Sequence, residues 1–181
     1  MTSQISVDTL KKLLICDFEA GTLTWLPRDR SMFKSDLSFH AWNKRFAGKE
    51  ALATKDKTGY FYGPILGKWH KAHRVIWAMK HGYWPPQEID HINGDGTDNR
   101  LENLRAVSPR QNRRNQKTPK TNTSGVLGVY WCKPDRKWKA QIKIDGRKIH
   151  LGAFSTIEDA AEARAAANVR FGFHENHGRA A

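Results

Sequence analysis

A polar stretch with the sequence QKTPKTNTSG, at residues 116–125, divides this chain into two parts. It contains no large apolar side chain, so it has the composition of a linker between domains rather than of a packed element. The 181 residues suffice for two small domains. We therefore expect an α+β protein with a first domain over residues 1–116, a linker over 117–123 and a second domain over 124–181.

The net charge is strongly positive, since 31 Lys and Arg residues stand against 18 Asp and Glu, which gives +13. Between Arg105 and His150 there are 13 basic and two acidic residues, so this segment carries +11 (13 minus 2). A charge of this kind favours polyanionic partners and says little about the fold. Nucleic acid is the leading partner.

The two cysteines, Cys16 and Cys132, form no C-x-x-C pair. They predict neither a zinc knuckle nor a disulfide framework. A reducing cytosol fits them best, and a single disulfide bridge between them is the alternative. No apolar run approaches the roughly 20 residues that span a bilayer, and the N-terminus lacks the order of a signal peptide. We expect a soluble cytoplasmic protein with no membrane partner.

Local patterns in the first part predict short helices and strands. The apolar positions of each expected helix recur about one turn apart, and aromatic and β-branched residues mark the strands. The expected elements are a helix over 6–16 capped by Ser6, a hairpin around GTLTWL (21–26), a poorly capped helix in 31–48, strands YFYGPIL (60–66) and KWHKAH (68–73), and a helix over 74–81 that ends at Gly82.

The stretch EIDHINGDG, residues 88–96, begins a set of polar residues at fixed spacing. Asp90 directly precedes His91, Asn103 follows twelve residues after the histidine, and Asn112 follows nine residues later. A turn at Asn93–Gly94 comes after the strand-like EIDH, and a helix begins at Ser108 with Pro109 in its first position. The strand must end or bend at the motif, because neighbouring residues of a regular strand point to opposite sides.

This set matches the needs of phosphodiester hydrolysis, which requires a base to activate water and a cation to neutralise developing negative charge. His91 supplies a base and Asp90 a carboxylate. Asn112 offers a neutral amide oxygen, which suits a hard cation such as Mg²⁺ that keeps several waters. An isolated Asp–His pair in a turn is usually a surface pair, but four residues at this spacing before an Arg-rich helix favour a site.

The segment AHRVIWAMKHG, continued by IDHINGDGTDNRLENLRAVSPRQNRRN, resembles the HNH (ββα-metal) endonucleases over about 45 residues. The resemblance is to the variant of phage and group I intron homing enzymes, in which Asn replaces the last His. It implies His91 as general base, Asp90 and Asn112 as ligands of one Mg²⁺ or Mn²⁺ ion, and Asn103 as the residue that braces the loop and orients the histidine. Zinc is less favoured, because an amide oxygen binds it poorly. We also expect Arg113 and Arg114 to contact DNA.

Three short strands and an Ala-rich helix are expected beyond the linker. The strand patterns are GVLGVYW (125–131), KWKAQIKI (137–144) and RKIHLGAF (147–154), with a turn at Asp145–Gly146, and the helix spans 156–172. One face of the sheet is basic and the other apolar, and such a ribbon can enter a major groove. A merely solvated basic face is the alternative. The outward residues are Lys139, Gln141, Lys143, Lys148 and His150.

The same string, from SGVLGVYW to LGAFSTIEDAAEARAAA, resembles the AP2/ERF DNA-binding domain from Ser124 to about Phe173. The resemblance implies DNA contacts at Gln141, Lys143, Lys148 and His150.

Together these features predict a metal-dependent endonuclease of the homing type, which nicks or cuts double-stranded DNA and carries a separate DNA-binding module. It would need no small-molecule cofactor, and a monomer is preferred with the oligomeric state left open. One alternative is a non-catalytic DNA-binding regulator that retains the HNH scaffold. Another is a structural or RNA-binding protein held by charge alone.

Overall fold

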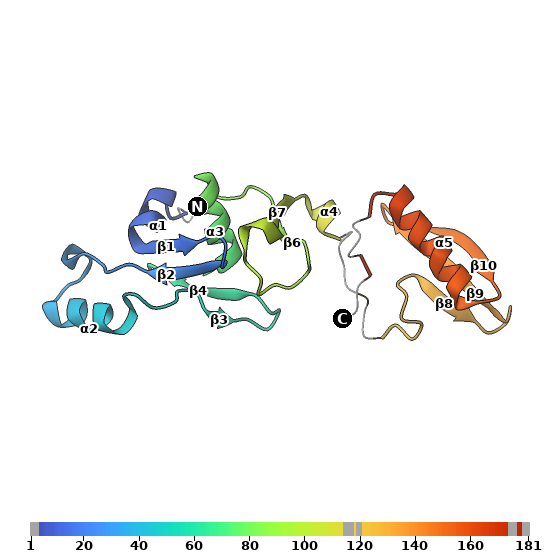
Figure 1. The fold of residues 1–181 in the computed structure, drawn as a ribbon, viewed down its shortest axis with the longest axis horizontal. Helices are drawn as coiled ribbons and strands as arrows, with labels where there is room; N and C mark the ends of the chain where they lie inside the picture. Colours follow the sequence, from blue (N-terminus) through green and yellow to red (C-terminus); the bar gives the residue numbers. More distant parts are fainter. Residues whose placement is uncertain (1–3, 114–117, 119–120, 174–176, 179–181) are drawn as a thin grey trace. The chain divides into compact units, whose positions relative to one another are not determined.

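Two units make up the chain, Met1–Val107 and Ser108–Ala181 (Figure 1). The computed structural model describes residues 4–113, 118, 121–173 and 177–178, apart from the side chains of Arg110 and Arg113. The division between the units falls before the expected linker. Within that expected linker Thr118 is buried, and its hydroxyl donates to the carbonyl oxygen of Gly178 at 2.6 Å. The extent of the linker stays a prediction.

The first unit is a mixed α/β structure with three small antiparallel sheets, β1–β2, β3–β4–β5 and β6–β7 (Figure 1). Its elements are α1 (Val7–Leu13), β1 (Leu14–Asp17), β2 (Thr22–Trp25), the 3-10 turn η1 (Arg30–Met32), α2 (Asp36–Phe46), β3 (Thr54–Lys55), β4 (Phe61–Ile65), β5 (Lys68–Lys71), α3 (Ala72–His81), β6 (Glu88–His91), the 3-10 turn η2 (Leu101–Asn103) and β7 (Leu104–Val107).

The N-terminal helix begins as predicted and ends earlier than predicted. Ser6 caps α1, because its hydroxyl accepts from the backbone N–H of Thr9 at 3.1 Å. The expected last turn is wrong: Leu14 begins β1 and lies opposite Trp25 of β2. Pairing with a partner strand therefore overrides the helical spacing from Leu14 onward.

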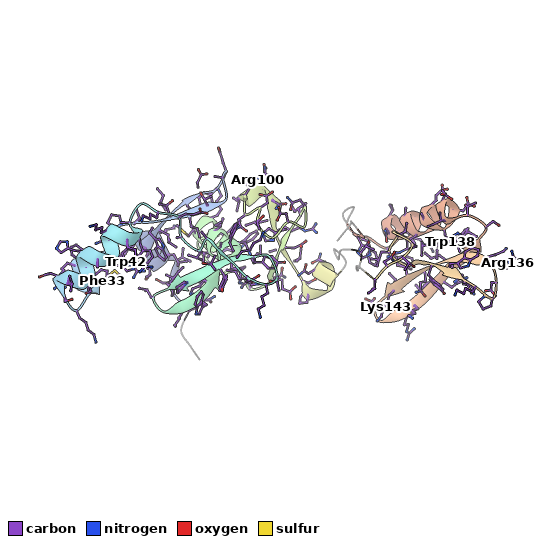
Figure 2. The ribbon with its side chains drawn as sticks, turned by 90° about the horizontal axis from the view of Figure 1, so that it is seen from below. Phe33, Trp42, Arg100, Arg136, Trp138 and Lys143 are labelled. Carbon is purple, nitrogen blue, oxygen red and sulfur yellow. The ribbon has the colours of Figure 1, made fainter. Side chains whose placement is uncertain are left out.

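Helix α2 is better capped than its sequence suggests. Ser35 supplies the cap, since its hydroxyl accepts from the N–H of Ser38 at 3.2 Å. None of its eleven residues, all of which the structure describes, is buried. The ring of Trp42 (Figure 2) meets that of Trp25 edge-on at 5.7 Å, and the Arg28 guanidinium lies 3.9 Å from the Trp42 centroid. Ring contacts rather than an apolar stripe thus attach α2 to the β1–β2 hairpin.

The core of the first unit lies between α1, α3 and the adjoining strands. Its most deeply buried apolar residues are Leu10, Leu13, Leu14, Leu23, Ile65, Val75, Ile76 and Ala78. Helix α3 begins at Ala72, two residues earlier than expected, and ends at Gly82, whose φ of 81° suits glycine. In the residues that the structure describes, no helix has both the length and the apolar character needed to cross a membrane.

The second unit places a three-stranded antiparallel sheet, in the order β10–β9–β8, against helix α5. Its elements are α4 (Pro109–Arg113), β8 (Val129–Cys132), β9 (Lys137–Ile144), β10 (Arg147–Phe154) and α5 (Ile157–Arg170). Asp145 and Gly146 both have positive φ, 49° and 85°, as a tight two-residue hairpin turn requires. Val129, Ala140 and Ala160 form the centre of a small core.

Candidate active site on the β6–β7 pair

Strand β6 delivers Asp90 and His91 to the point where the strand ends. Both residues are buried, and His91 lies opposite Leu104 of β7. The chain turns immediately afterwards, because the N–H of Gly94 donates to the His91 carbonyl oxygen at 2.8 Å and Gly94 adopts a φ of 72°. The expected end of the strand at the motif is thus observed.

The side chain of His91 is buried between two rings and the side-chain amide of an asparagine. Only 2% of its surface is exposed, and its Nε2 lies 2.9 Å from Oδ1 of Asn99. The rings of His73 and Tyr60 approach it with centroid separations of 5.0 and 5.5 Å. The imidazole is therefore held by a hydrogen bond at one nitrogen and by two neighbouring rings.

Asp90 is engaged by a cation from the facing strand. It lies opposite Arg105 of β7, whose Nε and Nη2 donate to Oδ2 of Asp90 at 3.0 and 2.8 Å. The Asp90 side chain is 10% exposed and that of Arg105 29%. This contact fixes the direction of the carboxylate and balances its charge.

Asn103 braces the loop between the two strands. Its Oδ1 accepts from the backbone N–H of Asn93 at 2.9 Å, and its Nδ2 donates to Oδ1 of Asn93 at 3.0 Å and to the carbonyl of Asp98 at 2.7 Å. These contacts fit the bracing role expected for Asn103. The hydrogen bond to the His91 ring, however, comes from Asn99.

The remaining candidates on this motif lie in the second unit. Helix α4 begins at Pro109 as predicted, with reciprocal bonds between Ser108 and Gln111 at its start. Asn112 is partly exposed, and its N–H donates to the Ser108 carbonyl at 3.0 Å. The side chain of Arg113 and the whole of Arg114 lie outside the described residues.

The expected DNA-binding face belongs to β9 and β10. Lys143 lies opposite Lys148 and Gln141 opposite His150, while the alternate residues Ala140 and Ile142 are buried. Figure 2 marks Lys143 on this sheet. Lys143, Lys148 and His150 are exposed. Lys139 forms an ion pair with Asp135, which raises the pKa of the lysine and lowers that of the carboxyl.

The donor atoms at the motif suit a hard cation better than a soft one. Among the described residues, no group of three or more His, Cys, Asp or Glu side chains is placed to hold a metal ion. What the motif offers is the Asp90 carboxylate, an oxygen donor of the kind that Mg²⁺ accepts together with water. Asp90 would be the anionic ligand, with Arg105 bound to its Oδ2.

Four residues of this site were not singled out from the sequence as site residues: Tyr60, His73, Asn99 and Arg105. Arg105 could have been found only through β7, a strand that the sequence analysis did not predict. Asn99 carries no local signal beyond its place in a polar loop. His73 is 4% exposed, and its ring packs against those of His91 and Tyr60.

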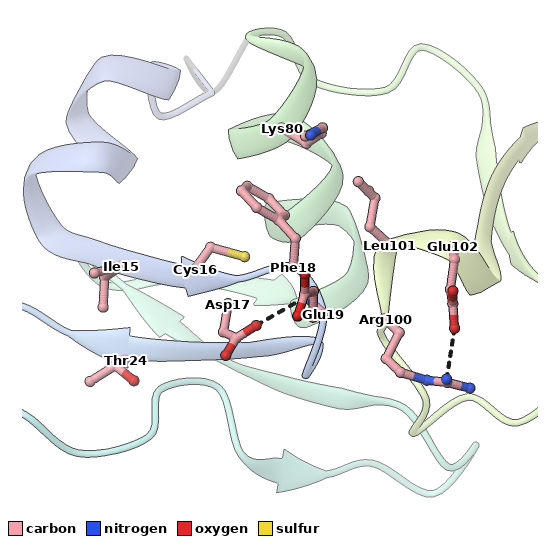
Figure 3. Close-up of a pocket in the computed structure, with 10 residues that line it drawn as sticks. All are labelled: Ile15, Cys16, Asp17, Phe18, Glu19, Thr24, Lys80, Arg100, Leu101 and Glu102. Carbon is pink, nitrogen blue, oxygen red and sulfur yellow. Dashed lines mark hydrogen bonds and ion pairs between the residues drawn. The ribbon is translucent and has the colours of Figure 1, made fainter.

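An open pocket elsewhere in the first unit offers no comparable chemistry (Figure 3). Its lining contains Asp17, whose carboxylate accepts from the N–H of Glu19, and Arg100, which pairs with Glu102 at 2.7 Å. Arg100 also binds Asp98 at 2.8 Å. Arg100 and Glu102 are thus engaged with each other, and the Asp17 carboxylate is held by backbone N–H groups.

Comparison with known proteins agrees with the geometry of the motif. The family model described as HNH endonuclease matches residues 70–114, in the middle of the chain, which include α3, β6 and β7. Protein 3.8 of Escherichia phage T7 is 34% identical over 92 residues, which are 50% of this chain and 76% of that protein. The chain therefore belongs to the HNH endonuclease family, whose members are nucleases or DNA-binding proteins. No solved structure matches it.

Proposed function

We propose that the chain is a divalent-metal-dependent DNA endonuclease that hydrolyses phosphodiester bonds, in the manner of homing enzymes. The observation that carries the proposal is the buried Asp90–His91 pair at the end of β6, with His91 bonded to Asn99, inside the segment that matches HNH endonucleases. A histidine fixed in this way is suited to act as a base rather than as a mobile surface group.

In the proposed reaction, His91 removes a proton from the attacking water, and Asn103 keeps the loop in the shape that presents it. Asp90 and Asn112 would hold one Mg²⁺ or Mn²⁺ ion. When bound, such an ion supplies the positive charge that stabilises the extra negative charge of the transition state and the departing 3′ oxygen. The products would be a 5′ phosphate and a 3′ hydroxyl. One site per chain predicts a nick unless two chains act together.

The second unit is proposed to act as a DNA-binding module of the AP2/ERF-like kind. The support is the alternation along β9, in which Lys143 is exposed while Ala140 and Ile142 are buried, together with the exposed Lys148 and His150 on β10. Long cationic side chains on such a sheet would reach phosphates and base edges in a major groove. Lys139, Gln141, Arg113 and Arg114 remain further candidates for contact with DNA.

A non-catalytic DNA-binding regulator is the second candidate. Two observations favour it: Arg105 already binds Asp90, and His91 is 2% exposed. The Arg105–Asp90 bond and the burial of His91 both stabilise the fold, and both would be retained in a protein that binds DNA without cleaving it.

The two candidates are separated by incubating supercoiled plasmid with the chain and Mg²⁺ or Mn²⁺. We expect nicked product from the natural chain, none from His91→Ala, and wild-type rates from His40→Ala, an exposed histidine on α2. Absence of nicking by the natural chain with either metal, together with tight binding to duplex DNA, would leave the regulator. Equal binding to duplex DNA, single strands and RNA would instead argue against a groove-reading sheet.

A further inference from the structure

We infer that Asn99 is a positioning residue, which fixes the neutral imidazole of His91 as the Nε2–H tautomer and so makes Nδ1 the atom that accepts the proton of the attacking water. The tautomer itself is a property of the folded chain. Its catalytic consequence rests on the proposed endonuclease function.

The chemistry of the two groups determines which of them donates the hydrogen bond between Asn99 and His91. Oδ1 of Asn99 lies 2.9 Å from Nε2 of His91. An amide oxygen carries lone pairs and no hydrogen, so the ring nitrogen at this distance must donate. A neutral imidazole has one N–H group, and once Nε2 carries it the basic lone pair belongs to Nδ1.

The backbone that carries Asn99 is held by the β1–β2 hairpin. The N–H of Leu101 donates to the carbonyl oxygen of Phe18 at 3.0 Å. Gly21, in the turn of that hairpin, lies so close that a Cβ there would be 2.4 Å from the carbonyl carbon of Asn99. Asn99 is only 3% exposed. The backbone of Asn99 therefore cannot shift away from His91 without moving the hairpin, and its side chain is buried beside the ring.

The neighbouring rings oppose the motion that would break the bond. A half-turn of the imidazole would carry Nε2 away from Asn99, but His73 and Tyr60 pack against it at centroid distances of 5.0 and 5.5 Å. Tyr60 is backed in turn by Gly96, where an added Cβ would lie 2.9 Å from the tyrosine ring. The Asn99 amide and the rings of His73 and Tyr60 thus all stabilise the same orientation of the His91 imidazole.

The tautomer can be read directly by nitrogen NMR of the full chain labelled with ¹⁵N in its histidine rings, at a mildly alkaline pH. The His91 signals are assigned from their loss in His91→Ala. We expect a protonated Nε2 and an unprotonated Nδ1. A protonated Nδ1 with an unprotonated Nε2 would overturn the inference. The NMR measurement does not depend on cleavage. A chain that never nicks DNA would refute the proposed function, whereas the NMR signals alone would decide the tautomer.

Variants of Asn99 then test the link to catalysis. Asn99→Ala should lower kcat for plasmid nicking at least about tenfold while the Kd for DNA changes less than about twofold, because the base is disordered and the DNA contacts remain. Asn99→Asp retains an acceptor oxygen and should keep Nε2 protonated. Asn99→Ala with an unchanged Nε2–H signal and unchanged kcat would contradict the inference, as would loss of the signal in Asn99→Asp.

Asn43→Ala is the matched control, since Asn43 is another asparagine of the first unit whose side-chain amide is hydrogen-bonded, in its case to the backbone N–H and carbonyl of Arg28 at 2.9 and 3.1 Å. It should leave both kcat and the His91 tautomer unchanged. An equal loss of kcat in Asn43→Ala would attribute the effect of Asn99→Ala to general loosening of the first unit, and the inference would then fail.

Discussion

Asp90 and Arg105 face each other across the β6–β7 pair, and both guanidinium bonds of Arg105 reach the same carboxylate oxygen, Oδ2, at 3.0 and 2.8 Å. The acidic residue of the motif is therefore tied to β7, a strand that the local sequence pattern does not predict. The ion pair also stabilises the folded chain, because the largely buried Asp90 carboxylate would otherwise carry an uncompensated charge.

Arg105→Met should lower the free energy of unfolding by about 3 kcal/mol, because it leaves the buried Asp90 carboxylate without its guanidinium. Arg105→Lys should cost less, since it keeps the charge and loses the fork. Urea unfolding measures both. Arg30→Met is the control, because the Arg30–Asp36 pair is 44% and 79% exposed and should contribute about 1 kcal/mol or less. Equal losses at Arg105 and Arg30 would contradict the role of burial.

His73 should make the first unit sensitive to acid. Burial, followed by the positive charges around it, lowers the pKa of His73 from its usual 6.5 to about 3. Between these values the unfolded chain binds the extra proton, so stability falls as pH falls below about 6.5. The free energy of unfolding should fall between pH 7 and pH 5, and His73→Phe should make this fall smaller by about 1–2 kcal/mol. Urea unfolding at the two pH values measures the difference. An unchanged pH slope, or the same change in exposed His40→Phe, would count against this.

Gly96→Ala should destabilise the first unit by about 1–3 kcal/mol, because the new Cβ would lie 2.9 Å from the Tyr60 ring and 3.2 Å from the Gly59 carbonyl oxygen. The cost should shrink in a Tyr60→Ala background, where the ring is gone. A double-mutant cycle followed by thermal unfolding measures this coupling. Strictly additive effects would show that Gly96 and Tyr60 do not press on one another.

Lys143 and Lys148, opposite each other in the sheet, should contribute to the salt dependence of DNA binding. If each neutralises one phosphate, changing both to Gln should reduce the slope of log K against log salt by about 2. Fluorescence anisotropy over a salt series gives the slope. The exposed pair Lys11 and Lys12 on α1 provides the control, and the same reduction there would show that total charge, and not this sheet, is what matters.

Cys16 should react slowly with alkylating reagents in the folded chain. Burial and the neighbouring carboxylate of Asp17 raise the pKa of its thiol from 9.0 to about 12, so the reactive thiolate is scarce at pH 8. Its rate with iodoacetamide, followed by peptide mass spectrometry, should rise at least about 100-fold in urea. Equal rates with and without urea would contradict the prediction.

Local signals in the sequence predicted the elements whose causes are local. Ser6 caps α1, Pro109 begins α4, and Asp145–Gly146 turns the β9–β10 hairpin, because each depends on residues within a few positions. The failures are also physical. The end of α1 at Leu13 depends on the pairing of Leu14 with Trp25 of the following strand, and the four-residue β7 is defined by its bonds to β6 rather than by its own pattern.

The sequence by itself determined the motif: an acid beside a histidine at a strand end, with asparagines at fixed distances, in a strongly basic chain. Only the tertiary structure decided which groups surround that histidine. Asn99, Tyr60, His73 and Arg105 reach Asp90 and His91 from different elements of the first unit. The reason is that spacing along the chain fixes only neighbours on the same element, whereas cross-strand pairing and core packing bring together residues that no local period relates.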